Sequence, residues 1–200
     1  METSMGKIVL NFYEKDAPKH VENFKKLAKS GYYDGTTFHR VIQNFMIQGG
    51  DPNSKDANPA NDGQGGPNYT VEAEIGRLHK RGALSAARQG DEVNPQKRSS
   101  GSQFYVVQNG PMSMDQLKGL EGQMKGVKGG AFAFTQDQID LYTTVGGTPF
   151  LDGDYTVYGE VIEGMDVVDK IASVAKDRRD RPIENVLIKT ITFETREVEE

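Results

Sequence analysis

Short segments in which apolar and polar residues alternate recur along this 200-residue chain, and clusters of Gly, Pro, Asn and Asp separate them. In the first, Ile8, Leu10 and Phe12 recur at a period of two, the pattern of a strand with one buried face. Strands are also predicted at 36–42, 45–48, 71–75, 104–108, 155–162 and 186–195. Strands outnumber helices and do not alternate regularly with them, which favours an antiparallel barrel or sandwich with plugged ends.

Two segments have the pattern of an amphipathic helix. The first follows Asp16, which is expected to cap it, with Pro18 in the first turn and Gly31 as the stop. The second follows Gly164, and its apolar face is formed by Val167, Val168, Ile171, Val174 and Ala175.

Residues 109–147 interrupt this pattern with a composition rich in Gly, Met, Gln and Lys. A helix is predicted after Thr135, which can form a capping box with Gln138, and Gly146 and Gly147 are expected to end it. We interpret the segment as an insertion between two strands of a single domain, residues 1–200. A loop of this length is functional or mobile. Because it contains no cluster of chemical groups, a mobile or structural role is favoured.

The composition excludes several classes of function. The net charge of -5, from 24 Lys and Arg against 29 Asp and Glu, disfavours a nucleic-acid binder. The absence of cysteine excludes disulfides and thiol nucleophiles, and the three histidines lack the spacing of metal ligands. The sequence has neither a basic and apolar leader nor an apolar span of about 18 residues. We therefore expect a soluble, cytoplasmic monomer without metal or membrane contacts, although a removed export signal would leave no trace.

The segment 38–51 places a permanent cation among apolar side chains and ends in two glycines. Arg40 cannot lose its proton, so burying it beside Phe45 is unfavourable unless a substrate with an apolar group next to a hydrogen-bond acceptor compensates. Gln48 follows at an even separation, so a turn at 43–44 can direct both side chains into one cleft. The alternative is a surface arginine, or one paired with Glu72 or Glu74.

Apolar residues available to line such a cleft are Phe45, Met46, Phe104, Tyr105, Phe150 and Leu151. Packing in the core is the alternative for each of them, although 150–153 lies at a turn, where apolar residues more often face a ligand. The glycines at 49–50 and 63–66 lack the features of a phosphate loop and are interpreted as turns. His39 is interpreted as a structural histidine, and Ser102 lacks the glycine pattern of a nucleophile elbow. The sequence therefore predicts non-covalent chemistry.

Five motifs, in this order, resemble those of the cyclophilin family of peptidyl-prolyl cis-trans isomerases. They are Phe-His-Arg-Val-Ile at 38–42, Phe-Met-Ile-Gln-Gly-Gly-Asp at 45–51, Gly-Gln-Gly-Gly at 63–66, Gly-Ser-Gln-Phe-Tyr at 101–105 and Phe-Leu-Asp-Gly at 150–153. The resemblance covers nearly the whole chain apart from 109–147. It implies a mainly β fold, a closed eight-stranded antiparallel β-barrel capped by two α-helices, here with an inserted, partly helical segment. It also implies proline-containing peptides and folding proteins as partners, and no cofactor.

The resemblance assigns roles by position. Arg40 is expected to be the catalytic arginine, and Gln48 and Gln103 are expected to hydrogen-bond the substrate and orient the arginine. Phe45, Met46, Tyr105 and Leu151 are expected to line the proline pocket, and Gly63 an adjoining pocket. Ala87, Arg88 and Gln89 are expected on an edge strand that pairs with the peptide. Phe150 and Tyr155 are also expected to bind substrate.

Four of these positions depart from the eukaryotic pattern. Tyr105 replaces a phenylalanine, and Phe150 replaces a tryptophan. Tyr155 replaces a histidine, and Arg88 replaces an asparagine. The last three resemble bacterial members of the family, in which the missing tryptophan accompanies weak binding of cyclosporin. Weak cyclosporin binding is therefore expected. Residues 43–44, where the family commonly has Pro-Gly, should alter only a turn.

The implied activity is rotation about X-Pro bonds, in support of protein folding. The barrier is about 18 to 20 kcal/mol because the nitrogen lone pair is delocalised, and a guanidinium that donates to the nitrogen of the twisted bond lowers it. A non-catalytic module that holds proline-containing segments is one alternative. A carbohydrate-binding barrel, disfavoured by the lack of tryptophan, is another. We further hypothesise that the insertion lies beside the groove and modulates access to it.

Overall fold

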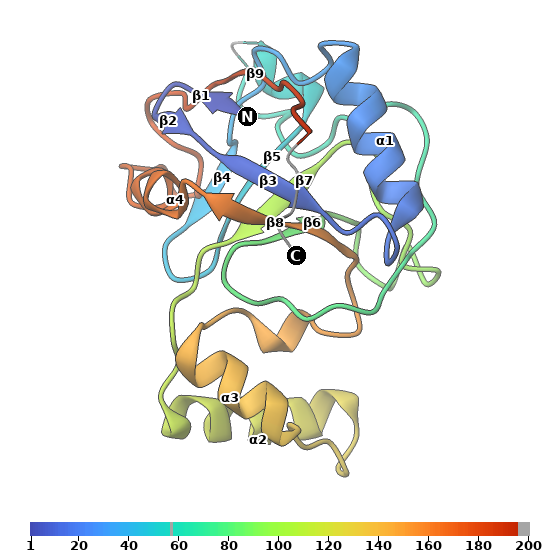
Figure 1. Ribbon diagram of the computed structural model, residues 1–200, viewed down its shortest axis with the longest axis vertical. Helices are drawn as coiled ribbons and strands as arrows, with labels where there is room; N and C mark the ends of the chain where they lie inside the picture. Colours follow the sequence, from blue (N-terminus) through green and yellow to red (C-terminus); the bar gives the residue numbers. More distant parts are fainter. Residues whose placement is uncertain (57, 196–200) are drawn as a thin grey trace.

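The computed structural model describes residues 1–56 and 58–195, which form a strand-rich body and a helical lobe (Figure 1). The strands are β1 (Glu2–Thr3), β2 (Gly6–Lys7), β3 (Val9–Phe12), β4 (Arg40–Ile42), β5 (Met46–Gly49), β6 (Ala83–Ala86), β7 (Phe104–Val107), β8 (Val157–Glu163) and β9 (Ile188–Thr190). The helices are α1 (Pro18–Lys29), α2 (Met114–Lys128), α3 (Gln136–Thr144) and α4 (Met165–Ala172), with 3₁₀ turns η1 (Pro52–Lys55) and η2 (Pro149–Leu151). The mainly β fold is confirmed, with four α-helices in these residues where the sequence indicates three.

The strands divide between two antiparallel sheets. The larger has the order β3-β8-β6-β7-β5-β4, and the smaller has the order β2-β1-β9. Backbone hydrogen bonds join the segments that flank the two sheets. The N–H of Phe38, before β4, donates to the carbonyl of Val186, before β9, at 3.0 Å, and that of Ile8, between β2 and β3, donates to the carbonyl of Met1 at 2.9 Å. Neither sheet closes on itself, so the predicted closed eight-stranded barrel is not confirmed.

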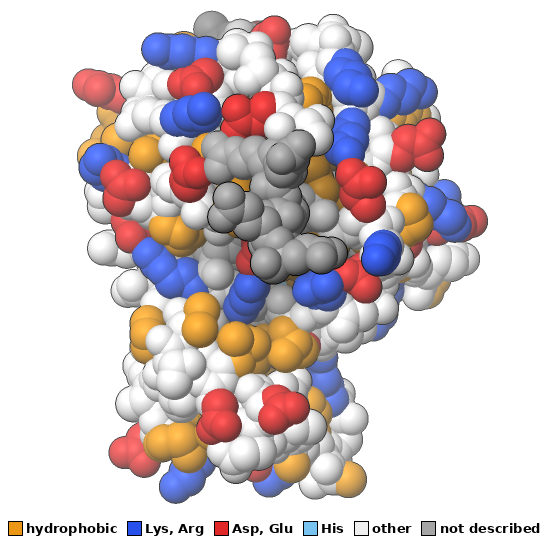
Figure 2. All heavy atoms as spheres, viewed as in Figure 1, with side chains coloured by type: hydrophobic (Ala, Val, Ile, Leu, Met, Phe, Trp, Pro, Cys, Tyr) orange, Lys and Arg blue, Asp and Glu red, His pale blue; other side chains and the backbone are white. Residues whose placement is uncertain are grey.

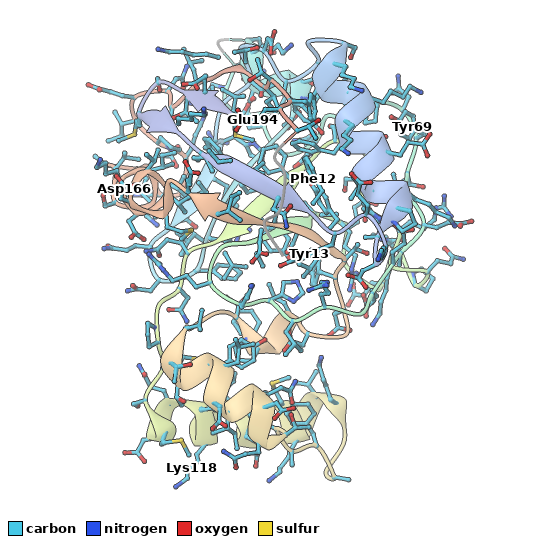
Figure 3. All side chains as sticks on the ribbon, viewed as in Figure 1. Phe12, Tyr13, Tyr69, Lys118, Asp166 and Glu194 are labelled. Carbon is cyan, nitrogen blue, oxygen red and sulfur yellow. The ribbon has the colours of Figure 1, made fainter. Side chains whose placement is uncertain are left out.

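Helices α1 and α4 lie on opposite sides of the body (Figure 1). Helix α1 buries its apolar face, and the ring of Phe24 lies 5.6 Å from that of Phe12, which is labelled on β3 in Figure 3. The predicted cap at Asp16 is wrong, because the N-cap is Ala17 and it makes no side-chain hydrogen bond. The carboxylate of Asp16 instead accepts a hydrogen bond from Nε of Arg77 at 2.6 Å.

Two other predicted elements differ from the structure. Residues 71–75 do not form a strand, because Val71 makes a single bridge to Ser99 and no strand pairs with the rest. Helix α4 follows Gly164 as predicted but ends at Ala172, so its predicted last turn lies outside the helix. None of the helices in the described part of the chain is long and apolar enough to span a membrane.

The insertion forms a helical hairpin with an apolar centre of its own. Helices α2 and α3 enclose a cluster of buried side chains: Leu117, Met124, Phe134 and Tyr142. Helix α3 begins with the predicted capping box of Thr135 and Gln138, and α2 begins with an equivalent box of Ser113 and Gln116. In the space-filling view the lobe is narrower than the body, and hydrophobic side chains gather where the two meet (Figure 2).

The larger sheet separates two apolar clusters. On its inner face, Val41, Ile47 and Val106 pack into the main core with α1 and α4. On its outer face, Met46, Tyr105 and neighbouring residues form a second cluster. Successive residues of a strand point to opposite faces, so each central strand contributes to both clusters. The sheet therefore presents a second apolar surface on the side away from the core.

Candidate active site

A cavity of about 190 Å³ opens on the outer face of the larger sheet, beside residues 151–155. Nine residues line it: Arg40, Phe45, Met46, Gln48, Ala87, Arg88, Tyr105, Leu151 and Tyr155. All nine are among the site residues that the sequence predicts. The four other predicted residues lie outside this lining: Gly63, Gln89, Gln103 and Phe150. Segments far apart in the sequence thus converge on one cavity.

Arg40 and Gln48 face each other across the β4–β5 hairpin. Directly opposed residues of antiparallel strands project to the same face, and Nη1 of Arg40 lies 3.5 Å from Oε1 of Gln48. The turn includes Asn44 with φ of +59°. The predicted facing of the two side chains is therefore confirmed. Arg40 is exposed, however, so the expectation of a buried cation is wrong for the free protein.

No ion pair among the described residues involves Arg40. Glu72 pairs with Lys19 and lies 3.6 Å from Arg98, and Glu74 lies 2.7 Å from Nδ1 of His20. The alternative in which either carboxylate neutralises Arg40 is therefore excluded. A guanidinium without a carboxylate partner at the mouth of an apolar cavity is available to donate to a neutral acceptor.

A chain of amide side chains fixes Gln48. Nε2 of Gln48 donates to Oε1 of Gln103 at 3.1 Å, and Nε2 of Gln103 donates to the carbonyls of Gly63 and Gly65 at 3.0 and 2.8 Å. This order of donors and acceptors leaves the Gln48 oxygen for Arg40. Gln103, Gly63 and Gln89 line a neighbouring hollow of about 850 Å³. They lie beside the cavity, and Gln103 connects the two.

The remainder of the cavity is mainly apolar. Met46 and Tyr105 are buried, while Phe45 and Leu151 are half-buried and pack against them. Phe150 is 41% exposed, and its ring lies 5.5 Å from that of Phe45. Phe150 therefore supports the wall from outside the lining. An apolar lining lowers the local dielectric and strengthens hydrogen bonds made at its mouth.

Arg88 and Tyr155 form one side of the cavity. Cζ of Arg88 lies 4.4 Å from the centre of the Tyr155 ring. Its Nε donates to the carbonyl of Asp154 at 2.8 Å, and Nη1 donates to the carbonyl of Gln89 and to the carboxylate of Asp91 at 2.9 and 2.6 Å. These bonds hold Nε and Nη1 in place, so Arg88 serves as part of the wall.

Residues 87–89 do not form the strand that the resemblance implies, and their pairing with a peptide stays a prediction. Strand β6 ends at Ala86 and lies inside the sheet, between β8 and β7. The N–H of Ala87 donates to the carbonyl of Gln103 at 3.0 Å, and its carbonyl accepts from Ser100 at 2.9 Å. The backbone of Ala87 is thus already hydrogen-bonded, although its side chain lines the cavity.

The glycines near the site are turns, as predicted. Gly50 has φ of +84°, and a Cβ there would collide with the carbonyl oxygen of Ser102. The N–H of Gly63 donates to the carboxylate of Asp51. These glycines let the chain turn closely behind Gln48.

His79 supports the wall, and the sequence reasoning did not find it. Nδ1 lies 3.0 Å from Oδ1 of Asp152, and Nε2 lies 3.0 Å from the hydroxyl of Tyr105. Because a carboxylate only accepts, Nδ1 carries the shared proton and Nε2 accepts from Tyr105. Burial raises the pKa of Tyr105 well above its usual value, which keeps this donor protonated. Asp152 lies in a recognised motif, but no local pattern marks His79 as its partner.

Residues 1–193 match the family model for cyclophilin type peptidyl-prolyl cis-trans isomerase/CLD. The chain belongs to the cyclophilin family. This confirms the resemblance carried by the five motifs, and the family is one of isomerase enzymes.

Relatives and solved structures agree with this assignment. A Staphylococcus aureus protein named as a peptidyl-prolyl cis-trans isomerase is 37% identical over 199 residues, which cover 97% of this chain and 90% of the relative. A Staphylococcus epidermidis protein of the same name is 36% identical over the same shares. A Cryptosporidium parvum cyclophilin type peptidyl-prolyl cis-trans isomerase, crystallised in the presence of the dipeptide Ala-Pro, has a TM-score of 0.69 and 25% identity, covering 98% of each chain.

The departures from the common cyclophilin pattern have partners in the structure. The hydroxyl that Tyr105 adds to phenylalanine meets His79. Arg88 and Tyr155, which replace asparagine and histidine, stack on each other. These three side chains therefore have partners within the site.

Proposed function

We propose that this cyclophilin accelerates rotation about X-Pro peptide bonds, with Arg40 as the catalytic residue. The observation that carries the proposal is the position of Arg40, opposed to Gln48 and without a carboxylate partner among the described residues, at the mouth of an apolar cavity. The family match supports the same activity. We further propose that the protein assists folding as a cytoplasmic monomer that acts on proline-containing peptides and folding proteins.

The proposed mechanism uses one hydrogen bond that strengthens as the peptide bond twists. Resonance in the planar X-Pro amide gives a barrier of about 18 to 20 kcal/mol and leaves the nitrogen a poor acceptor. Twisting localises the lone pair on nitrogen, and Arg40 then donates to it. An interaction that is stronger in the transition state than in the ground state lowers the barrier.

The cavity has two tasks in this mechanism. Met46, Phe45, Tyr105 and Leu151 hold the proline ring while the preceding carbonyl swings. They also exclude water, so that the bond from Arg40 acts in a medium of lower dielectric. Arg40 is exposed in the free protein, and a bound proline would cover it. Gln48 accepts from Arg40 and keeps the guanidinium directed toward the ring.

A protease-coupled assay on an X-Pro peptide tests the proposal. We expect acceleration by the wild type and a loss of about a hundredfold in Arg40→Ala. Arg40→Lys should also perform poorly, because its ammonium is more strongly hydrated and lacks the planar fork. Arg179→Ala is the control, since Arg179 is 59% exposed and pairs with Asp177, outside the cavity lining. No acceleration by the wild type, or equal activity in Arg40→Ala, contradicts the proposal.

A non-catalytic peptide-binding module is the second candidate, because the same cavity would also hold a proline ring in a protein without turnover. Binding of an X-Pro peptide without acceleration would favour this function. Isothermal titration and the isomerase assay on the same peptide together distinguish the two, because the enzyme should bind the peptide and also accelerate its isomerisation.

A further inference from the structure

The insertion contacts the cavity wall without lining the cavity. None of the lining residues comes from 109–147. Two of the insertion's side chains nevertheless reach the segment 151–155, which supplies Leu151 and Tyr155 to the lining. The Tyr142 hydroxyl on α3 donates to Oδ2 of Asp152 at 2.5 Å. The Lys128 ammonium on α2 donates to the carbonyl of Asp152 and lies 2.8 Å from the carboxylate of Asp154.

Asp152 connects the insertion to the body of the protein. Its Oδ2 is bonded to Tyr142, while its Oδ1 accepts from the backbone N–H of His79 at 2.8 Å and lies 3.0 Å from Nδ1 of the same residue. His79 in turn contacts Tyr105 in the cavity. A continuous chain of hydrogen bonds therefore runs from α3 to the cavity lining, and Tyr142 and His79, both fully buried, lie within it.

The charges of these groups suit their contacts. Burial and the nearby Asp152 carboxylate raise the pKa of Tyr142, so its hydroxyl remains a donor at neutral pH. Burial acts to raise the pKa of Asp154, but hydrogen bonds from Lys128 and Lys97 outweigh it and lower that pKa. Tyr142 is thus protonated and can donate, and Asp154 is ionised and can accept. Hydrogen bonds to ionised groups are stronger than those between neutral groups.

We infer that the α2–α3 hairpin is a positioning element for the proline pocket, in which Tyr142 and Lys128 hold the segment that carries Leu151 and Tyr155. This inference rests on the proposed function. It places the insertion behind the wall and replaces the hypothesis that the insertion modulates access to the groove. The wall contacts the proline ring in the ground state and in the transition state alike, whereas Arg40 comes from β4. A looser wall should therefore raise KM by a larger factor than it lowers kcat, since the wall also keeps water from the hydrogen bond of Arg40.

Two variants test this inference against two matched controls. Tyr142→Phe keeps the buried ring and removes the hydroxyl, and Lys128→Met removes the ammonium. Lys125→Met is the control, because Lys125 lies one turn earlier on α2 and pairs with Glu121 of the same helix at 2.9 Å. Lys118→Met is a second control, since Lys118 lies at the end of the lobe away from the body (Figure 3). We expect KM for an X-Pro peptide to rise about fivefold in Tyr142→Phe and Lys128→Met and to be unchanged in both controls.

A spectroscopic measurement follows the chain of hydrogen bonds directly. The sequence contains three histidines, so the ring nitrogen NMR signals of His79 can be assigned by comparison with His79→Gln. Tyr142→Phe should shift these signals, because Asp152 then loses a donor and interacts more strongly with His79. The controls should leave them in place. Thermal unfolding of each variant checks that the lobe remains folded. If Tyr142→Phe unfolds, Lys128→Met decides the result.

The outcomes separate this inference from the proposed function. If the wild type is active and both test variants keep its KM, the inference is wrong. It is also wrong if Lys125→Met raises KM by the same factor, or if kcat falls in the test variants while their KM stays unchanged. If the wild type is inactive, the proposed function fails, and the His79 signals together with peptide affinity still test whether Tyr142 positions the wall.

Discussion

The guanidinium of Arg88 lies over the ring of Tyr155, with 4.4 Å between Cζ and the ring centre. The same guanidinium donates to the carbonyl of Asp154, so one buried cation fixes both the ring and the backbone beside it. The Arg88 side chain is 4% exposed. Such a group stabilises the fold as long as all its bonds are made, and removing it leaves acceptors without donors.

Arg88→Met should therefore destabilise the protein by about 2 kcal/mol, through lost hydrogen bonds and the lost cation–π contact. Urea unfolding measures the change. Arg179→Met, at a side chain that is 59% exposed, should change the free energy of unfolding by less than about 0.5 kcal/mol. Equal effects of the two substitutions contradict the role assigned to Arg88.

Gln48 and Gln103 should act as a unit. Their amides are joined by a hydrogen bond of 3.1 Å, so Gln48→Ala and Gln103→Ala should each lower kcat/KM, and the double variant should lose less than the product of the two. We expect a coupling free energy of about 1 kcal/mol in this cycle. Strict additivity would show that Gln48 is oriented without Gln103.

Stability should fall on mild acidification. Burial lowers the pKa of both His39 and His20, whereas the unfolded chain has histidines with a pKa of about 6.5. Below that pH the unfolded state takes up protons that the folded state refuses, so the free energy of unfolding falls from about pH 6.5 downward. Urea unfolding between about pH 7.5 and 5.5, above the range in which carboxylates titrate, measures the slope. His39→Gln should flatten the slope, and an unchanged slope contradicts the assignment.

Asn44 should tolerate glycine better than alanine. Its φ of +59° lies in the left-handed region. There a Cβ atom costs about 1 to 2 kcal/mol, and asparagine is tolerated. Asn44→Ala should lower the free energy of unfolding by about 1 kcal/mol, and Asn44→Gly should change it little. The backbone N–H of residue 44 donates to Oε1 of Gln108 at 2.7 Å in either case. A loss in Asn44→Gly equal to that in Asn44→Ala would point to a role for the asparagine side chain.

Cyclosporin should bind weakly to the wild type and more tightly to Phe150→Trp. Phe150 stands where the resemblance places the tryptophan of the eukaryotic pattern, and its ring is 41% exposed beside Phe45. Because a larger ring with an N–H donor adds contact area and a hydrogen bond, we expect a gain of about tenfold in affinity. Titration calorimetry with both proteins measures it. Phe150→Leu is the control and should not bind more tightly.

Features set by local interactions could be predicted from the sequence. The facing of Arg40 and Gln48 depends on a short hairpin, and the capping box of Thr135 and Gln138 on four residues. Helix α2 begins with the same kind of box, formed by Ser113 and Gln116, but no helix is predicted there from the sequence. Its interior contains glycines at 119, 122 and 126, which lower helix propensity. Packing of Leu117 and Met124 against the other helix compensates for them.

Features that depend on distant partners could not be predicted. Residues 71–75 have the alternation of a strand, but Glu72 and Glu74 pair with Lys19 and His20 of α1, and no described strand pairs with this segment. His79 and Asp152 are 73 residues apart in the sequence. Their contact depends on the packed position of both segments, so the sequence indicates neither the contact nor its continuation to the insertion.

Along each central strand, side chains point alternately to the core and to the cavity. This alternation restricts which changes of sequence the protein can accept. Adding or removing one residue within β5 would exchange Met46 with Ile47 and bring Gln48 into the core, because the side-chain period is two. The cavity can therefore diversify by substitution, whereas changes in length are confined to the connections between strands. The hairpin at 109–147 lies in such a connection, between β7 and β8. A lineage can acquire new structure there without altering the register on which the site depends.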